Sequence, residues 1–348
     1  MIGQSMKAIV YSSNGDSEVL KLEERPVPDP GPGEVRVEVH VSGVNPTDWK
    51  VRAGLSGSLG DGESQVPNQD GAGRIDAVGA GVDPARIGER VWLYLSAAGR
   101  PDGGTAQEYL TIPAERAVPL ADGADYDLGA ALGVPALTAH RALTLAADGP
   151  DRLAPGALAG WTVLIAGGAG AVGNAAIQLA RWAGATVITT VSSPEKADLA
   201  KAAGAHHIVN YRTQDVAKVI LDLAPDGVDL VAEVAPAVNA ELNLAVTRNN
   251  ATIAFYANNG GDELRLPLRA TFGRNLDWHG LSLYSVPAEP MRNGVAAVSE
   301  AVATGALRAG AEAGLPLVRF PLEQTAQAHE AVESGTVGKV LIDVRETA

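Results

Sequence analysis

The stretch TVLIAGGAGAVGNAAIQLARWAG, residues 162–184, holds three local patterns in succession. The apolar run TVLIA predicts a buried strand, and the Ala- and Leu-rich run after the glycines predicts a helix. Three glycines lie between them. Gly168 allows a tight turn, Gly170 allows a pyrophosphate to approach the backbone, and Gly173 allows the helix and the strand to pack closely. Free N–H groups at the helix start favour the same anion. We therefore predict a dinucleotide-binding loop; the alternative is a glycine-rich turn in a chain with 40 glycines.

The residues around this stretch alternate between strand and helix patterns. From Trp161 to about Ser285, helical patterns separate five apolar runs: TVLIAG, TVITTVS, HIVNY, VDLVAEV and ATIAFYA. This order predicts a doubly wound parallel sheet with helices on both faces, and so an α/β fold class.

The first third of the chain has short alternating runs between Gly- and Pro-rich turns. They predict a compact antiparallel β domain, and they are KAIVY (7–11), EVRVEVHVSGV (34–44), GRIDAVG (73–79), ERVWLYL (89–95) and AQEYLTI (106–112). Near Asp125 an Ala- and Leu-rich pattern predicts a bridging helix. After Ser285, two helical stretches precede the last strand pattern, GKVLIDV (338–344), which we expect to return to the first domain.

Length and composition exclude several classes of function. A chain of 348 residues favours two domains. With 41 acidic and 27 basic residues the formal charge is −14, so nucleic acid and anionic membrane surfaces are poor partners. The absence of cysteine excludes disulfides, thiolate zinc sites and cysteine nucleophiles. No window has the composition of a membrane helix or a secretory signal, so we expect a cytoplasmic protein.

The end of the second strand pattern bears on the choice of dinucleotide. An NAD site usually has an acid there to bind the ribose 2′-hydroxyl. Here the strand ends in Val191–Ser193, and Glu195 follows a proline, where a carboxylate commonly stabilises a first helical turn. Lys196, Tyr211 and Arg212 are expected at the same edge and suit a 2′-phosphate. We predict NADPH rather than NADH; the alternative for Lys196 is a solvated helix charge.

Several motifs together resemble the medium-chain dehydrogenase/reductase superfamily, and within it the zinc-free quinone oxidoreductases related to zeta-crystallin. The motifs are GVNPTDWKVRAG, VPNQDGAGRIDAVGAGV, IGERV, GGTAQEYLTIPAERAVPL, GAALGVPALTAHRAL, the glycine loop and the terminal GKVLIDV. The resemblance implies a GroES-like β-rich catalytic domain of residues 1–136 and 286–348, with a Rossmann domain of residues 137–285 inserted. It also implies an active site in the cleft and a homodimer paired near GLSLY (280–284).

The loop VSGVNPTDWK (41–50) invites comparison with the zinc alcohol dehydrogenases. Their corresponding loop reads G-I-C-G-T-D, and Asn45 stands where they have a zinc-ligating cysteine. Their GHE motif corresponds to Asn68-Gln69-Asp70. Amides are poor zinc ligands beside thiolate or imidazole, and the six histidines form no ligand spacing, so we predict no metal. Without a Lewis acid, hydride transfer suits an electrophilic acceptor, a quinone or an α,β-unsaturated carbonyl.

Several residues are candidates for contact with the acceptor, and some carry alternatives. Asn45 is expected to face the nicotinamide and to donate to the acceptor carbonyl, although Asn-Pro is also a turn-forming pair. Asp48 is expected to cap a helix beginning near Trp49. Zeta-crystallin-like enzymes have a tyrosine where this chain has Lys50, which leaves the substrate open. Tyr256 and Tyr284 are candidate proton donors to an enolate.

The resemblance implies a set of cofactor contacts. The pyrophosphate would contact Gly168, Ala169, Gly170, Ala171, Val172 and Gly173, and the 2′-phosphate Ser193, Lys196 and Tyr211. The nicotinamide ribose and ring would contact Asn45, Thr138, Val234, Phe255, Tyr256, Ala257, Asn258, Leu281 and Ser282. Lys339 resembles a position near the cofactor phosphates, with a charge at a strand start as its alternative.

Three functions follow as hypotheses. The first is a zinc-independent NADPH:quinone reductase, and its rival is an NADPH-dependent enone or alkenal reductase. The third is a non-catalytic NADPH-binding sensor.

Overall fold

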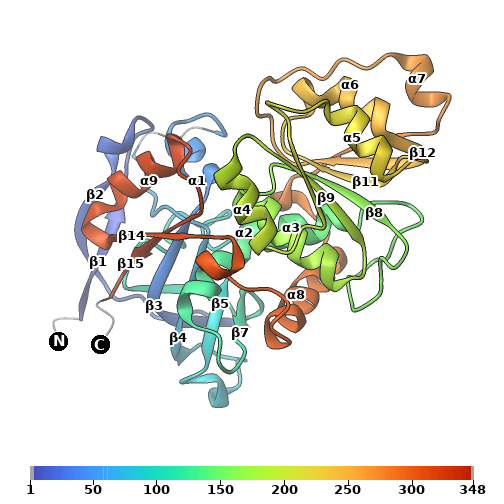
Figure 1. Cartoon of the computed structure of the whole chain (residues 1–348). Helices are drawn as coiled ribbons and strands as arrows, with labels where there is room; N and C mark the ends of the chain where they lie inside the picture. The colour runs from blue at the N-terminus through green and yellow to red at the C-terminus, as the bar shows by residue number, and fades with distance from the viewer. Residues whose placement is uncertain (1–3, 58, 61, 346–348) are drawn as a thin grey trace. The chain divides into compact units, whose positions relative to one another are not determined.

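The structure, a computed structural model, describes residues 4–57, 59–60 and 62–345. The chain forms two compact units (Figure 1). Unit 1 comprises Met1–Val134 and Leu317–Ala348, and unit 2 comprises Pro135–Pro316. The first and last strands of the chain, blue and red in Figure 1, both belong to unit 1. The expected return of the last strand pattern to the first domain is therefore confirmed.

Unit 1 is built mainly of antiparallel strands. Its strands and helices are β1 (Ser5–Val10), β2 (Lys21–Pro26), β3 (Glu34–Val44), α1 (Pro46–Arg52), β4 (Asp70–Val78), β5 (Arg90–Leu93), β6 (Tyr109–Pro113), β7 (Ala117–Pro119), the first half of α2 (Tyr126–Leu143), β14 (Leu317–Pro321), α9 (Thr325–Glu333) and β15 (Lys339–Asp343). Its larger sheet has the order β14-β15-β3-β4-β5-β7, with β6 also paired to β3, and β1 pairs with β2. β15 is antiparallel to β3 and parallel to β14.

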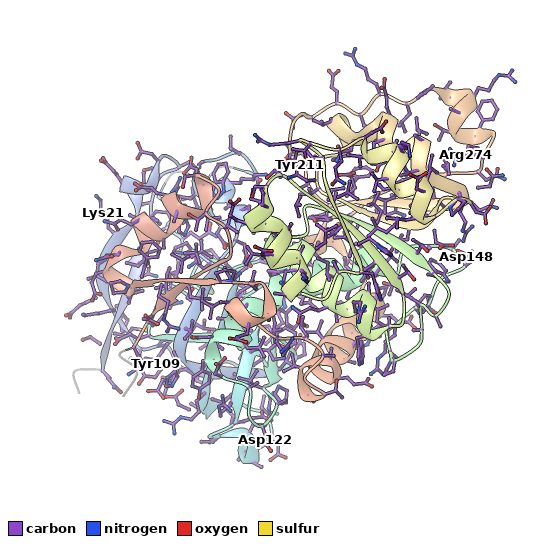
Figure 2. All side chains as sticks on the ribbon, in the orientation of Figure 1. Lys21, Tyr109, Asp122, Asp148, Tyr211 and Arg274 are labelled. Carbon is purple, nitrogen blue, oxygen red and sulfur yellow. The ribbon has the colours of Figure 1, made fainter. Side chains whose placement is uncertain are left out.

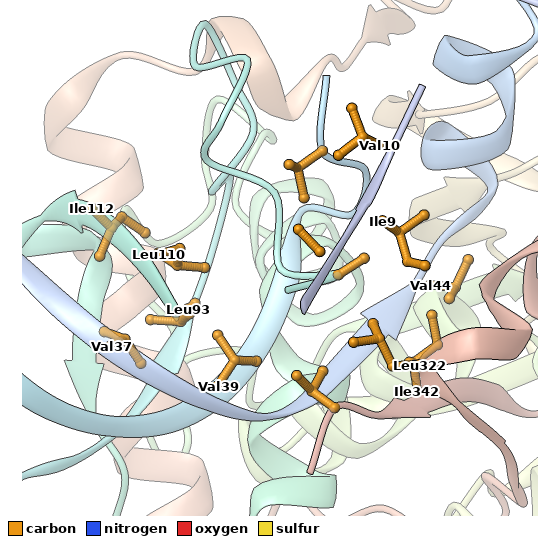
Figure 3. Packing of buried hydrophobic residues seen from close by; sticks show 14 of the residues in the cluster. Ile9, Val10, Val37, Val39, Val44, Leu93, Leu110, Ile112, Leu322 and Ile342 are labelled. Carbon is orange, nitrogen blue, oxygen red and sulfur yellow. The ribbon is translucent and has the colours of Figure 1, made fainter. Parts of the chain in front are cut away.

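The core of unit 1 joins residues that are far apart in the sequence. Figure 3 shows Ile9 of β1, Val39 and Val44 of β3 and Ile342 of β15 in one buried cluster. Side chains of β3 alternate between buried and half-buried up to residue 40, as a strand with one covered face requires. Residues 41–44 are all buried, because a smaller cluster that includes Ala130 of α2 covers the second face.

Unit 2 is a parallel sheet covered by helices. Its elements are β8 (Thr162–Ala166), α3 (Ala171–Trp182), β9 (Thr186–Val191), α4 (Pro194–Ala202), β10 (His207–Asn210), α5 (Val216–Leu223), β11 (Val228–Glu233), α6 (Pro236–Val246), β12 (Thr247–Phe255), α7 (Leu268–Phe272), β13 (Asp277–Gly280) and α8 (Ala288–Ala303). The strand order is β10-β9-β8-β11-β12-β13. Figure 1 shows α3 and α4 on one side of this sheet and α5 and α6 on the other. The predicted α/β fold class is confirmed.

The second boundary between the units differs from the expected residue 286. Unit 2 continues to Pro316 because the segment after β13 packs on its helices. On α3, Asn174 Nδ2 donates to Ala313 O (2.8 Å) and Gln178 Nε2 donates to Arg308 O (3.0 Å). Gly294 of α8 lies so close to α2 that a Cβ would approach His140 to 3.3 Å. The helical stretch that begins at residue 288 therefore belongs to the parallel-sheet unit.

Four of the described strands, β2, β7, β13 and β14, have no counterpart in the sequence expectations. β13 is an edge strand of four residues, Asp-Trp-His-Gly, which alternates too briefly to be recognised. β14 contains Arg319 and ends in Pro321, and its pattern is neither apolar nor strictly alternating. No helix among the described residues has the length and apolarity needed to cross a membrane.

Candidate functional site

The glycine loop in unit 2 follows β8, where the strand order changes direction. From β8 the chain adds β9 and β10 on one side and β11, β12 and β13 on the other, so the carboxyl end of β8 is the switch point at which such sheets bind ligands. α3 begins at Ala171 with Gly170 as its N-cap. Its first-turn N–H groups have no partner within the helix and so are available to an anion.

The glycines of the loop have distinct spatial roles. A Cβ at Gly168 would lie 2.2 Å from Thr189 Oγ1, and one at Gly173 would lie 2.3 Å from Gly167 O. A Cβ at Gly170 would have Gly167 O at 3.5 Å as its nearest neighbour. The outer two glycines are therefore required by packing, whereas the middle one faces open space, as a pyrophosphate site needs.

The tight turn after β8 spans Gly167–Gly170, where Gly170 N–H donates to Gly167 O (3.0 Å), so Gly168 lies within it as expected. Gly167 has a φ of +72°, a left-handed conformation that favours glycine. Gly168 is also needed for its close approach to β9, where Thr189 Oγ1 donates to Ile165 O (2.7 Å). The glycine with the left-handed conformation, Gly167, lies outside the G-x-G-x-x-G spacing.

The edge predicted to bind the ribose lies beyond β9. Ser193 is the N-cap of α4, and its Oγ accepts from Lys196 N (3.3 Å). Tyr211 lies in the loop after β10, labelled in Figure 2, and its N–H donates to Val191 O (3.0 Å). Its side chain is 52% exposed. Hydrogen bonding by Ser193 lowers the pKa of Glu195, which keeps that exposed carboxylate ionised at neutral pH.

Three neighbouring strands bring the residues expected at the nicotinamide together. Val234 follows β11, Phe255 ends β12 and residues 256–258 follow it, and Leu281 and Ser282 follow β13. Leu281 N–H donates to Phe255 O (2.8 Å). Tyr256 N–H donates to Glu233 O (3.2 Å), which links β12 to β11. Together with β8 these strands place the residues along one edge of the sheet, as the parallel topology requires.

The sequence reasoning missed Glu233, a fully buried carboxylate at the end of β11. It accepts from Ala235 N (2.6 Å) and from the amides of Asn239 (3.1 Å) and Asn243 (2.8 Å). Burial and, second, the charge of Glu233 raise the pKa of Tyr256, so this phenol stays protonated. A polar residue ending an apolar strand, followed by two asparagines four apart, was the available signal.

Three further residues, Thr138, Asn258 and Tyr284, were expected either at the nicotinamide or as proton donors. Thr138 lies buried on α2. Asn258 Nδ2 donates to Asp262 Oδ1. Tyr284 is 45% exposed in the short helical turn after Ser282.

In unit 1, Asn45 begins α1 as its N-cap. Asn45 N–H donates to Asp48 Oδ2 (2.7 Å), so Asp48 is the first-turn acid of a capping arrangement. The helix starts at Pro46, three residues before the expected start near Trp49, because proline is well suited to a first helical position. Asp48 does assist the helix start, but from inside the first turn.

The side chain of Asn45 lies in a buried polar cluster. Asn45 Nδ2 donates to Asp70 Oδ2 (2.6 Å), and Lys339 Nζ donates to Asn45 Oδ1 (2.7 Å) and lies 3.4 Å from Asp70 Oδ2. Asp70 Oδ1 accepts from Val134 N (2.8 Å) in α2. The exposed fractions are 2% for Asn45, 0% for Asp70 and 1% for Lys339. Lys339 is thus not a solvated charge at a strand start, because its ammonium is buried against Asn45 and Asp70.

Burial governs the ionisation of this cluster. It raises the pKa of Asp70 and lowers that of Lys339, and in each case the partner's charge opposes the shift. Burial, with the charge of Asp70 second, raises the pKa of Asp48 to about 8. With a pKa of about 8, Asp48 is mainly protonated at neutral pH and adds no charge beside Asp70 and Lys339.

A second buried network adjoins the first. His329 Nε2 lies 2.9 Å from Asn68 Oδ1, and Asn68 Nδ2 donates to Ser42 Oγ (3.0 Å). Ser42 Oγ lies 2.6 Å from Thr105 Oγ1, which donates to Asp70 O (2.6 Å). Within the described residues, no group of three or more His, Cys, Asp or Glu side chains is arranged to hold a metal ion.

Comparisons with known families and proteins agree with this architecture. The alcohol dehydrogenase GroES-like domain matches residues 31–122, and the zinc-binding dehydrogenase family matches residues 171–301. A quinone oxidoreductase from Rattus norvegicus is 33% identical over 345 residues, which is 97% of each chain. A 2-haloacrylate reductase from Burkholderia sp is 32% identical over 97% of this chain and 98% of that protein.

A solved structure extends the similarity to three dimensions. Escherichia coli quinone oxidoreductase complexed with NADPH superposes with a TM-score of 0.80 at 25% identity, over 97% of this chain and 99% of that one. The similarity covers both compact units, including the parallel sheet of unit 2. The chain therefore belongs to the quinone oxidoreductase branch of the medium-chain dehydrogenase/reductase superfamily.

Proposed function

We propose that this chain is a zinc-independent, NADPH-dependent oxidoreductase that reduces a quinone. The observation that carries the proposal is the glycine loop at the switch point of the sheet, in which Gly168 and Gly173 are packed and Gly170 faces open space. The space at Gly170 and the free N–H groups of α3 fit a pyrophosphate. Quinone oxidoreductases of similar length support the choice of acceptor.

NADPH, when bound, supplies the hydride, and the residues of the chain bind, orient and protonate. The loop residues 168–173 would hold the pyrophosphate. Val234, residues 255–258 and the Leu281–Ser282 pair would orient the nicotinamide from the ends of β11, β12 and β13. Thr138 remains a proposed contact through the family resemblance.

The preference for NADPH rests on the residues after β9. Ser193, Lys196 and Tyr211 would bind the 2′-phosphate, since no acid ends the strand to take a ribose hydroxyl. The exposed carboxylate of Glu195 opposes this preference by its charge. The ammonium of Lys196 must therefore outweigh it.

Two side chains are proposed for the acceptor. Asn45 would orient the carbonyl group of the acceptor by donating a hydrogen bond from its side-chain amide. Tyr256 would deliver a proton, since its raised pKa keeps the phenolic hydrogen in place at neutral pH. Tyr284 is a second candidate for the proton because its side chain is 45% exposed.

The 2-haloacrylate reductase relative favours a second candidate function. That protein is named for reducing 2-haloacrylate, a compound that contains an activated carbon–carbon double bond, and it matches this chain as fully as the quinone oxidoreductases do. An enone or alkenal reductase of this kind would use the same cofactor and would likewise work without a metal. Its product is a saturated carbonyl rather than a quinol.

The decisive experiment measures NADPH oxidation by the purified chain with a panel of quinones and a panel of enones. Faster turnover of quinones, with quinol recovered, supports the first function, and saturated carbonyl products support the second. NADPH binding without consumption of any acceptor would reject both, and the chain would then be a cofactor-binding sensor. Fluorescence titration of NADPH provides the binding measurement independently of turnover.

We also propose that two copies of the chain pair in solution and that they work in the cytoplasm. β13 ends the strand order of its sheet, so its outer edge can add a strand from a second copy. Light scattering on the purified protein would report a mass near twice that of the chain. A monomer at micromolar concentration would reject the pairing.

A further inference from the structure

The buried cluster of Asn45, Asp70 and Lys339 has an arrangement that packing alone does not explain. Two opposite charges and one amide, from β15, the start of β4 and the N-cap of α1, lie within hydrogen-bond distance with almost no exposure. Taking charges out of water is costly, and well-packed apolar groups commonly serve stability as well or better. An arrangement of this cost is expected where the orientation of a group matters.

The chemistry of the partners permits one orientation of the Asn45 amide. An ammonium only donates hydrogen bonds and an ionised carboxylate only accepts them. The amide oxygen must therefore face Lys339 and the amide nitrogen must face Asp70. A flipped amide would set two donors against each other at Lys339 and two acceptors against each other at Asp70.

Two glycines make room for the charged partners. A Cβ at Gly43 of β3 would lie 3.0 Å from Lys339 Cε and 2.0 Å from Ala130 O of α2. A Cβ at Gly133 of α2 would lie 2.1 Å from Asp70 Oδ1. The absence of side chains at these positions lets Lys339 reach Asn45 and lets Asp70 Oδ1 reach the N–H of Val134.

We propose that Lys339 and Asp70 are positioning residues that hold the Asn45 amide in one orientation, with its nitrogen directed to Asp70 and its second N–H as the donor for the acceptor carbonyl. The part that concerns the acceptor rests on the proposed function. In this role Lys339 is an internal cation that is satisfied by the protein, and it does not bind the cofactor phosphates.

The test compares Lys339→Met with the double variant Lys339→Met/Asp70→Asn. The single variant leaves a buried carboxylate without its cation, so both stability and kcat fall. The double variant contains no charge at either position, so stability recovers. Residue 70 is then an amide that can both donate and accept, and Asn45 loses its fixed orientation. We expect kcat to remain reduced by about tenfold or more, as for a misdirected donor.

Two further measurements separate this role from others. NADPH affinity, measured by fluorescence titration, should change by less than about twofold in the double variant, since the proposal gives Lys339 no cofactor contact. A large loss of NADPH affinity with unchanged kcat would assign Lys339 to the phosphates and overturn the proposal. Val340→Ala, a core substitution at the next residue of β15, is the matched control: it should lower stability without lowering kcat.

NMR of the Asn45 side chain tests the orientation without any turnover. In the wild-type chain the two Nδ2 hydrogens should give two resolved signals, one of them shifted by the Asp70 carboxylate, with Asn45→Ala providing the assignment. In the double variant the shifted signal should return toward ordinary asparagine values. Wild-type signals in the double variant, or a wild-type kcat, would overturn the positioning role. If no acceptor is ever reduced but the shifted signal is present, the proposed function fails and the orientation stands.

Discussion

At the scale of single residues, Asp48 makes the stability of the folded chain depend on pH between 3.8 and about 8. Burial and the charge of Asp70 raise its pKa to about 8, far above the ordinary value for aspartate. Between these two values the folded state holds a proton that the unfolded state has released. Stability therefore falls as pH rises through that window, by up to about 1.4 kcal/mol per pH unit.

Replacing Asp48 by Asn should flatten this dependence. The amide oxygen can still accept from Asn45 N–H, so the helix start is retained. In urea unfolding between about pH 5 and about pH 8, the variant should gain stability relative to the wild type as pH rises. Asp222→Asn, at an exposed residue of α5, is the control and should show the wild-type slope. Parallel curves for wild type and Asp48→Asn would contradict the raised pKa.

Two adjacent residues of α4 should change cofactor preference in opposite directions. Lys196→Ala removes a cation from the proposed 2′-phosphate site and should raise the KM for NADPH about tenfold or more, with little effect on NADH. Glu195→Gln removes an anion from the same edge and should lower the KM for NADPH. Lys201→Ala, at the other end of α4, should leave both values unchanged. Equal effects on NADPH and NADH would reject the 2′-phosphate role.

At the scale of elements, the glycine loop allows a matched pair of substitutions. Gly173→Ala places a Cβ against the backbone of Gly167 and should shift α3, with a loss of about 1–3 kcal/mol of stability. Gly170 has a φ of −81° and open space, so Gly170→Ala should fold as the wild type does. That methyl group stands where the pyrophosphate would approach, and NADPH affinity should fall sharply.

Thermal unfolding and NADPH titration of the two variants check this pair. The expected result is a lower Tm for Gly173→Ala and an unchanged Tm with weakened binding for Gly170→Ala. Full NADPH affinity in Gly170→Ala would mean that the cofactor does not approach this glycine.

How much the sequence predicts also depends on the element. The sequence predicted β3 with its observed bounds, and it predicted β8, α3 and β9 in succession. These elements have long patterns that are local in the sequence. The start of α1 was misplaced because the capping role of Asn45 depends on a hydrogen bond to its own first turn.

The part of the candidate site that is contiguous in the sequence was predicted, and the part that depends on distant residues was not. The glycine loop is contiguous in the sequence, and its residues are recognised by their spacing. Lys339 and Asn45 are 294 residues apart, and only the pairing of β15 with β3 brings them together. The partners of Lys339 were therefore beyond any local pattern.

At the scale of the whole molecule, one buried histidine in each unit makes the chain sensitive to acid. Burial lowers the pKa of His140 in unit 2 to about 4 and that of His329 in unit 1 to about 3. His140 Nε2 accepts from Leu153 N (3.3 Å), and His329 Nε2 bonds to Asn68 Oδ1. Below the ordinary histidine pKa near 6.5, the unfolded chain binds protons that the folded chain excludes, so stability falls as pH falls.

Substitutions that do not titrate should relieve this sensitivity in each unit separately. His329→Gln keeps a side-chain N–H for Asn68, and His140→Asn keeps an acceptor for Leu153, although both lose packing at neutral pH. As the pH falls from about 6.5 to the pKa of the replaced histidine in the folded wild-type chain, the free energy of unfolding of each variant should rise relative to that of the wild type. The expected rise is up to about 1.4 kcal/mol per pH unit. Urea unfolding at several pH values would measure this gain, and His207→Asn in β10 is the control. A constant difference between variant and wild type across this range would show that the buried histidines already carry their protons when folded. In that case acid sensitivity would have to arise from the carboxylates that are paired with arginine and lysine in both units, and it would not depend on either histidine.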